Sequence, residues 1–170
     1  TSLNGKSEKL TIFSWIWAKT VPSPDPAYSD CYVPLASSFM LSAKKGKKVC
    51  IVPEIDKWTK KITYQIQYDP DEQQTIVAKN GTKLSRGANF VCLLSGAAIT
   101  PEYVKECGKN GRMSQSLIAI VALHGRSKVY LPPDMDHEKL ALDIIAPEFD
   151  DLDLPRHPQY VGVRGYGVEK

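Results

Sequence analysis

Alternation of apolar and polar residues is the strongest periodic signal in this chain. From Ile62 to Tyr68 every second residue is apolar or aromatic, and the residues between them are Thr63, Gln65 and Gln67. Successive side chains of a strand point to opposite faces, so this pattern predicts a strand with one buried face. A second alternation, from Leu10 to Val21, predicts a longer strand. One of its faces carries Phe13, Trp15 and Trp17, and the other carries Ile12, Ser14, Ile16 and Ala18.

A hairpin is expected around the lysine-rich segment 44–48. Residues 37–43 and 48–53 are suited to strands on either side of it. Gly46 can adopt the positive φ that a short turn needs. The four lysines of this segment are therefore predicted to lie on one hairpin tip.

A second hairpin signal is the Asn80-Gly81 dipeptide, which predicts a turn between strands at residues 76–79 and 82–84. The segment 116–124 leaves two alternatives open. Its β-branched residues favour a strand, and its Leu and Ala residues favour a helix.

Two short helices are expected in the second half of the chain. Thr100 can cap the first, with Pro101 at its first position and Glu102 in its first turn, and Gly108 or Gly111 can end it. The second can begin at Asp134 or Asp136. Its apolar stripe consists of Leu140, Ala141, Ile144 and Ile145, and Pro147 ends the helix.

These elements predict an α+β fold, mostly antiparallel sheet and hairpins, with about two short helices. The chain has 170 residues, of which 42% are hydrophobic and 24% charged, so residues 1–170 are expected to form a single domain. Residues 148–170, rich in Asp, Pro and Gly, are predicted to be an extended tail. The sequence shows neither an apolar run of about 20 residues nor a signal-peptide core, which predicts a cytoplasmic protein without membrane contact.

The turn from Cys92 to Gly96 is similar to a zinc knuckle in which Ser95 has replaced the second thiolate. An earlier turn has the same eroded character, with Ser23 and Tyr28 at the expected ligand positions and one thiol displaced to Cys31. Two thiolates cannot hold a structural zinc ion, so no bound metal is expected. Apolar packing by Tyr28, Phe90, Val91 and Leu93 is expected to take its place.

The four cysteines do not have the spacing of a secreted disulfide framework. A disulfide between Cys31 and Cys92 stays open as an alternative, although a reducing compartment disfavours it. Cys50 lies in an apolar run and Cys107 near a predicted helix end, so both are interpreted as structural residues.

Several short motifs, in this order, resemble those of one protein family. They are Trp15-Ile16-Trp17-Ala18-Lys19-Thr20-Val21, the two turns, Pro34-Leu35, Lys44-Lys45-Gly46-Lys47-Lys48 and Gly108-Lys109-Asn110-Gly111-Arg112-Met113. Between about Ile12 and Tyr166 the chain is similar to the large adenine-specific DNA methylases that carry a zinc-ribbon insertion. The resemblance implies a degenerate zinc-ribbon-like part within the fold.

The resemblance also implies that this segment is not catalytic. Neither a Gly-rich loop for S-adenosylmethionine nor an Asp-Pro-Pro-Tyr motif is present, and the nearest strings, at residues 68–71 and 131–134, are interpreted as turns. We therefore expect an insertion domain cut from a larger methyltransferase, or a remnant without catalysis. S-adenosylmethionine is expected in the parent enzyme, and the flanking methyltransferase segments are expected partners.

DNA is the partner that the resemblance implies, and basic residues are the candidates for contacting it. By itself a net charge of +3 favours a merely solvated lysine tip, and the resemblance reverses that preference. The candidates are Lys44, Lys45, Lys47, Lys48, Lys105, Lys109, Arg112, Arg126 and Lys128. The aromatic residues at strand spacing, Trp15, Trp17, Tyr64 and Tyr68, are interpreted as core.

The leading hypothesis is a DNA-gripping domain. The alternative is a structural or protein-interaction module that packs on a catalytic domain without touching DNA. The two differ in whether the lysine tip shares a continuous basic face with Arg112 and Lys128. The histidines, His124, His137 and His157, are too far apart to predict a catalytic or metal site.

Overall fold

The computed structural model describes residues 2–3, 6–7, 10–125 and 127–143. Close contacts divide the chain into two units, residues 1–138 and residues 139–170, and each is described by itself. Of the sequence predictions, Ile144, Ile145, Pro147 and the tail 148–170 lie outside the described residues, as does Arg126.

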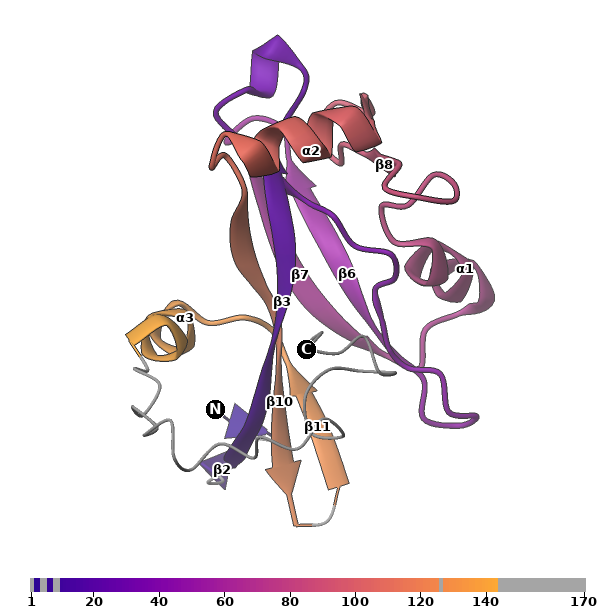
Figure 1. Cartoon of the computed structure of the whole chain (residues 1–170). Coiled ribbons are helices and arrows are strands. Elements are labelled where there is room, and N and C mark those ends of the chain that lie inside the picture. The colour runs from indigo at the N-terminus through magenta and orange to yellow at the C-terminus, as the bar shows by residue number, and fades with distance from the viewer. Residues whose placement is uncertain (1, 4–5, 8–9, 126, 144–170) are drawn as a thin grey trace, which may run out of the picture. The chain divides into compact units, whose positions relative to one another are not determined.

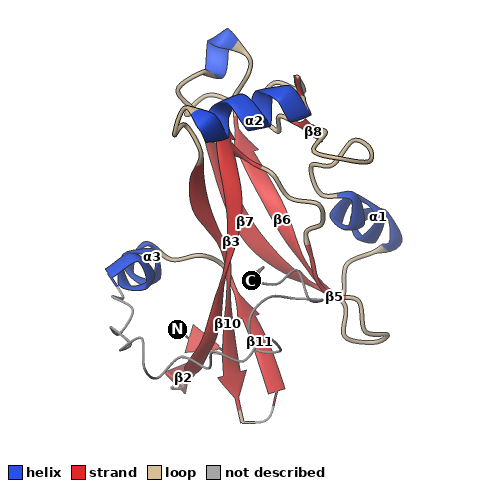
Figure 2. Cartoon of the chain, in the orientation of Figure 1, coloured by secondary structure: helices blue, strands red, loops and turns tan. Residues whose placement is uncertain are grey.

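The first unit is built mainly from two antiparallel sheets (Figures 1 and 2). The four-stranded sheet has the order β11-β10-β3-β4, and the three-stranded sheet has the order β5-β6-β7. The fold class is therefore α+β and mostly β, as predicted. The four-stranded sheet consists of β3 (Thr11–Pro22), β4 (Tyr32–Pro34), β10 (Ser114–His124) and β11 (Ser127–Leu131), and the three-stranded sheet of β5 (Met40–Ser42), β6 (Val49–Asp56) and β7 (Lys61–Tyr68).

Strands β3 and β10, far apart in the sequence, pair along most of their length. This pairing resolves the ambiguous segment 116–124 as a strand, and five consecutive residues of it, Ile118 to Ala122, are buried. A strand that is buried on both faces has a continuous apolar sequence without alternation. The spacing of apolar residues alone therefore could not distinguish this strand from a helix.

A β-bulge in β3 changes which side chains share a face. Ser14 pairs with Val121 and Ile12 with Ala122, so Phe13 is the extra residue between them. Ile12 precedes the bulge and the two tryptophans follow it, yet Ile12 packs with Trp15 and Trp17 against Leu117 and Ile120 in the core. Phe13, in contrast, is 57% exposed. The prediction that Phe13 shares a face with the two tryptophans, and that Ile12 lies opposite, was therefore wrong.

The other face of β3 and β10 contributes to a core shared with the three-stranded sheet. Ala18, Ile118 and Ala119 belong to one cluster with Cys50 and Tyr64. The hairpin predicted around residues 44–48 is present, since Met40 of β5 pairs with Cys50 of β6 and Gly46 has a φ of +71°. The predicted strand at residues 62–68 is β7, which pairs with β6 along its whole length.

The hairpin predicted at Asn80-Gly81 is wrong, because a third helix, α1 (Glu72–Asn80), lies there. Asp71 and Gln74 form a capping box at its start, in which each side chain accepts from the other's backbone N–H. Gly81, with a φ of +57°, ends it, and a Cβ at this position would collide with the carbonyl oxygen of Ala36. The dipeptide therefore ends a helix instead of turning a hairpin.

The two predicted helices are α2 (Pro101–Lys109) and α3 (Met135–Asp143). Thr100 caps α2 and accepts from the N–H of Tyr103, as predicted. Asp134 precedes α3 and its carboxylate accepts from the N–H of Asp136. The short elements are β1 (Ser2–Leu3), β2 (Lys6–Ser7), the 3-10 turn η1 (Pro26–Tyr28), β8 (Phe90–Val91) and β9 (Ala98–Ile99). None of the helices in the described ranges is long and apolar enough to cross a membrane.

Candidate nucleic-acid interface

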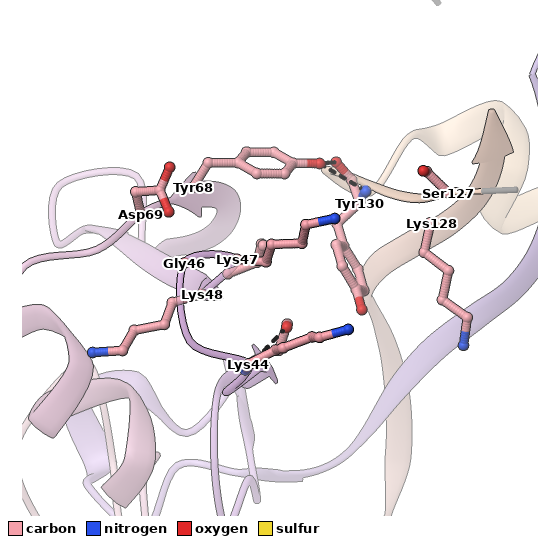
Figure 3. Close-up of a pocket in the computed structure, with 11 residues that line it drawn as sticks. Lys44, Gly46, Lys47, Lys48, Tyr68, Asp69, Ser127, Lys128 and Tyr130 are labelled. Atoms are coloured by element: carbon pink, nitrogen blue, oxygen red, sulfur yellow. Dashed lines mark hydrogen bonds between the residues drawn. The ribbon is translucent and has the colours of Figure 1, made fainter. Parts of the chain in front are cut away.

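The lysine tip lies beside β11 and lines a pocket of about 440 Å³ (Figure 3). Lys44, Lys47 and Lys48 come from the β5–β6 turn and Lys128 from β11. We call this site the lysine pocket. Its other polar lining residues are Ser42, Tyr68, Asp69, Ser127 and Tyr130. Of the nine predicted basic residues, the structure thus brings four together here.

The β5–β6 turn is held by its own backbone. The N–H of Lys47 donates to the carbonyl of Lys44 at 2.9 Å, and Gly46 supplies the left-handed residue that closes the turn. The carbonyl of Lys48 accepts from the N–H of Asp69 at 2.9 Å, which ties the turn to the end of β7. The lysine backbones are therefore hydrogen-bonded, while the side chains of Lys44, Lys45 and Lys47 are exposed and that of Lys48 is half-buried.

Tyr68 joins the two sheets at the pocket. Its hydroxyl donates to the carbonyl of Tyr130 at 2.9 Å and accepts from the N–H of the same residue at 2.8 Å. The hydroxyl of Tyr130 in turn donates to the carbonyl of Leu41 at 3.4 Å. These bonds hold β11, and with it Lys128, against the lysine tip. The interpretation of Tyr68 as core was wrong, because it is 47% exposed and lines the pocket.

The pocket carries more positive than negative charge, with four lysines and the one carboxylate of Asp69. Figure 3 shows Lys44 and Lys47 extending toward Tyr130, whereas the ammonium of Lys48 points away from it. The ion pairs within the described residues, Lys60–Asp30 and Arg112–Glu106, involve none of the pocket lysines. The ammonium of Lys128 lies 4.9 Å from the centre of the Phe13 ring. These cations are therefore available to an anionic ligand.

The basic residues of the α2 region lie elsewhere. Tyr103 of α2 donates to the carbonyl of Pro22, at the end of β3 opposite to the β10–β11 turn (Figure 1). Arg112 pairs with Glu106 at 2.7 Å and lies 5.8 Å from the centre of the Tyr103 ring. Lys105, Lys109 and Arg112 therefore do not extend the lysine pocket, and Lys45 is exposed on the tip without lining it. The continuous basic face includes Lys128 but excludes Arg112.

The two turns that the sequence analysis compared with zinc knuckles face each other at the α2 end of the first unit. The hydroxyl of Ser23 and the thiol of Cys92 are 3.3 Å apart, and Ser95 also hydrogen-bonds to Cys92. The backbone of Cys31 pairs with that of Ser23, and the Cys31 side chain packs on the same core cluster as Cys92. We call Ser23, Cys31, Cys92 and Ser95 the hydroxyl–thiol cluster. Gly96, with a φ of +78°, closes the second turn.

The hydroxyl–thiol cluster does not fit a structural zinc ion. It contains two sulfur atoms, and the Ser23 hydroxyl that would have to replace a third is used in the bond to Cys92. Cys31 directs its thiol to the carboxylate of Asp30 at 3.5 Å. Among the described residues no group of three or more His, Cys, Asp or Glu side chains has the arrangement of a metal site.

Packing surrounds this cluster. Val21, Val33, Leu94, Ile99 and Cys107 form one buried group with Cys92. Of the four residues predicted to replace the metal, Tyr28 and Phe90 pack on this group. Leu93 packs instead on the cluster that contains Cys50 and Tyr64. All four cysteines are free thiols. Cys50 is buried, as its apolar run predicted, and Cys107 is buried too.

The two thiols of the cluster differ in acidity. Burial alone would raise the pKa of Cys92, but hydrogen bonds from Ser23, Ser95 and the backbone of Ser95 and Leu94 lower it below its ordinary value. Burial, followed by the bond to Asp30, raises the pKa of the Cys31 thiol. Cys92 is therefore the more acidic thiol of the pair, although its side chain is 1% exposed.

The β6–β7 turn was not among the predicted sites. Trp58 at its tip is 94% exposed, the highest value among the large hydrophobic residues of the described chain. The signal was present in the segment Lys57-Trp58-Thr59-Lys60-Lys61, where an aromatic residue lies among three lysines. By contrast, Trp15, Trp17 and Tyr64 pack in the core, as predicted.

Comparison of the chain with protein-family models, with curated proteins and with solved structures finds no match.

Proposed function

We propose that this chain is a non-catalytic, DNA-gripping domain of an S-adenosylmethionine-dependent adenine-specific DNA methyltransferase. The observation that carries the proposal is the lysine pocket, which Lys44, Lys47, Lys48 and Lys128 line without ion-pair partners among the described residues. Lysines at a protein surface contact DNA phosphates and release condensed counterions, which favours binding at low salt. A cytoplasmic location accords with a partner of this kind.

The resemblance of the short motifs to those of adenine-specific DNA methylases supports a methyltransferase as the parent enzyme. The local structure supports a non-catalytic role for this chain. Asp69 and Pro70 lead into the cap of α1, and Pro132 to Asp134 lead into α3. Both strings therefore have the structural roles of turns and caps. S-adenosylmethionine belongs to the flanking segments of the proposed parent enzyme, which would also supply the catalytic residues.

A protein-interaction module is the second candidate, and one surface favours it. Ile76 and Val77 on α1 are about half exposed. Beside them, an apolar groove of about 150 Å³ between α1 and β6 is lined by Phe39, Cys50, Val52 and Val77 among others. A catalytic domain could cover this groove while the lysine pocket, on other elements, stays free.

Fluorescence anisotropy with labelled duplex DNA over a series of salt concentrations tests the proposal. Two variants are compared with the natural chain. One has Ala in place of all four tip lysines, Lys44, Lys45, Lys47 and Lys48, and the other is Lys128→Ala. The slope of log affinity against log salt should fall by roughly 0.9 for each phosphate that the variant no longer neutralises, so Lys128→Ala should reduce it by about 1.

Arg112→Ala is the matched control, because this cation lies outside the pocket and is paired with Glu106. It should leave the slope unchanged. An equal loss for Arg112→Ala and Lys128→Ala would show that DNA contacts are not concentrated at the pocket. A chain that does not bind duplex at low salt would contradict the proposal and favour the interaction module.

A further inference from the structure

The tip of the β6–β7 hairpin presents an aromatic ring to solvent. Trp58 lies in the turn that joins the two longest strands of the three-stranded sheet and is 94% exposed. Trp15 and Trp17, in contrast, pack against Leu117 and Ile120. Because the Trp58 indole is almost fully accessible, burial in this fold does not explain it.

The turn that carries Trp58 is rigid at the backbone. One oxygen of the Asp56 carboxylate accepts from the N–H groups of Trp58 at 2.9 Å and Thr59 at 3.1 Å. The other accepts from the Thr59 hydroxyl at 2.6 Å. These bonds, led by the one from the Thr59 hydroxyl, lower the pKa of Asp56. Lys60 takes a φ of +55° and closes the turn onto the first strand pair, Asp56 with Lys61.

Three lysines flank Trp58 in the sequence. Lys57 precedes it, and Lys60 and Lys61 follow within three residues, all of them exposed. Lys60 is paired with Asp30 at 3.5 Å and lies 5.8 Å from the centre of the Tyr28 ring. Lys57 and Lys61 have no ion pair among the described residues. Lys61 interacts electrostatically with the Asp56 carboxylate of the turn, and both lysines are exposed. An exposed ring on a hydrogen-bonded turn, with exposed cations next to it in the sequence, suits a ligand that is both planar and anionic.

We infer that this turn is a base-stacking site, where the Trp58 indole stacks on an unpaired base of a nucleic acid and Lys57 and Lys61 contact the adjoining phosphates. Aromatic rings stack on any base that is free of its partner, and basic side chains follow the backbone on either side. A membrane surface is less well suited, because one indole flanked by Thr59 and lysines offers little apolar area to insert.

The stacking site is separate from the lysine pocket. The two lie at opposite ends of β6, whose eight residues span about 26 Å. This distance corresponds to roughly eight base pairs of duplex. The inference rests on the proposed function only in sharing a nucleic acid as partner, and it adds a second contact with a different preference, for bases that are not paired.

The test uses the full chain and three labelled probes, which are a paired duplex, the same duplex with one base left unpaired, and a single strand of about four nucleotides. Tryptophan fluorescence and anisotropy are measured at low salt for the natural chain and for Trp58→Ala. Leu84→Ala is the matched control, since Leu84 is also exposed, at 57%, but lies on another loop. Circular dichroism checks that each variant is folded.

The single strand and the unpaired base should quench tryptophan emission in the natural chain, and Trp58→Ala should abolish the quenching. This variant should also bind the duplex with the unpaired base about tenfold more weakly, while its affinity for the paired duplex and its salt slope stay unchanged. Leu84→Ala should behave like the natural chain.

Unchanged quenching in Trp58→Ala, or an equal loss for paired and unpaired probes, would overturn the inference and leave the lysine pocket as the DNA contact. Quenching by the single strand without duplex binding would support the stacking site and contradict the proposed function. A blue shift with vesicles of anionic phospholipid, and no response to any nucleic acid, would overturn the inference in favour of a membrane surface.

Discussion

The lysine pocket and the hydroxyl–thiol cluster both come from turns that the sequence marks as unusual, yet the fold treats them in opposite ways. At the lysine pocket, the side chains of Lys44, Lys47 and Lys128 are exposed and lie around a polar hollow. At the hydroxyl–thiol cluster, Cys92 is 1% and Ser23 2% exposed. The first region therefore presents its charged groups to solvent, and the second places its polar groups inside the fold.

The difference follows from what each residue type requires. A lysine ammonium loses hydration when it is buried, so a turn with four lysines stays at the surface and can meet phosphates there. A thiol and a hydroxyl can be buried at little cost if they hydrogen-bond to each other, and Ser23 and Cys92 do so at 3.3 Å. Apolar packing from Val21, Val33 and Ile99 then surrounds them.

Restoring the missing sulfur should change the hydroxyl–thiol cluster most. Ser23→Cys and Ser95→Cys together would add two thiols to those of Cys31 and Cys92, so that four converge, and we expect stoichiometric Zn²⁺ or Co²⁺ binding. Structural zinc in comparable four-ligand sites contributes about 10 kcal/mol or more of apparent binding free energy. Cobalt absorbance of a tetrahedral thiolate site is the measurement. Adding Cys92→Ala should abolish the band, and its absence from the double variant would show that the side chains do not converge.

Creating a cavity beside the cluster should destabilise the protein strongly, whereas changes in the lysine tip should not. Ile99 is fully buried, so Ile99→Ala should lower the free energy of unfolding by about 2–5 kcal/mol. Each tip lysine is a surface residue, and its change to Ala should stay within about 0.5 kcal/mol. Urea unfolding of both variants measures this contrast. Similar losses in both would mean that the lysine tip also carries structural contacts.

The core between the two regions should respond to alkaline pH through Tyr64. Burial, offset only in part by a hydrogen bond with Ser116, raises the pKa of Tyr64 to about 12 from an ordinary value near 10. The native state keeps this proton while the unfolded state loses it, so stability is fully present below about pH 10 and falls toward pH 12. The loss attributable to Tyr64 is about 2–3 kcal/mol.

Tyr64→Phe removes the ionisable group and should make the decline between pH 10 and 12 shallower. Unfolding curves at several pH values in this window, compared with those of the natural chain, provide the measurement. Parallel declines in both proteins would assign the pH dependence to other groups.

Loosening the lysine pocket should give a smaller loss of stability than the changes to Ile99 and Tyr64. Tyr68→Phe removes both bonds to the backbone of Tyr130, of 2.8 and 2.9 Å, and should lower the free energy of unfolding by about 1 kcal/mol. DNA affinity should fall less than in Lys128→Ala, because the cation remains but is held less firmly. Tyr130→Phe is the control, since it loses only a bond of 3.4 Å to Leu41. If both variants lost equal stability, Tyr68 would not be the tether.

Much of the local structure was determined by the sequence itself. The alternation at residues 62–68 predicted β7, and the Thr100-Pro101 start predicted α2, because local periodicity and caps act over a few residues. The lysine tip was predicted for the same reason, since polar residues around Gly46 favour a turn wherever the strands lie. Even α1 had a local signal in the Asp71–Gln74 capping box, which the Asn80-Gly81 dipeptide outweighed in the prediction.

The tertiary structure decided what distant segments do together. The pairing of β3 with β10 determined that residues 116–124 form a strand, and its bulge moved Phe13 out of the core. Lys128 joins the lysine pocket, and Arg112 does not, because β11 is tied to β7 by Tyr68 while α2 packs at the other end of β3. Such contacts depend on register and packing between segments far apart in the chain, and short-range patterns carry no information about them.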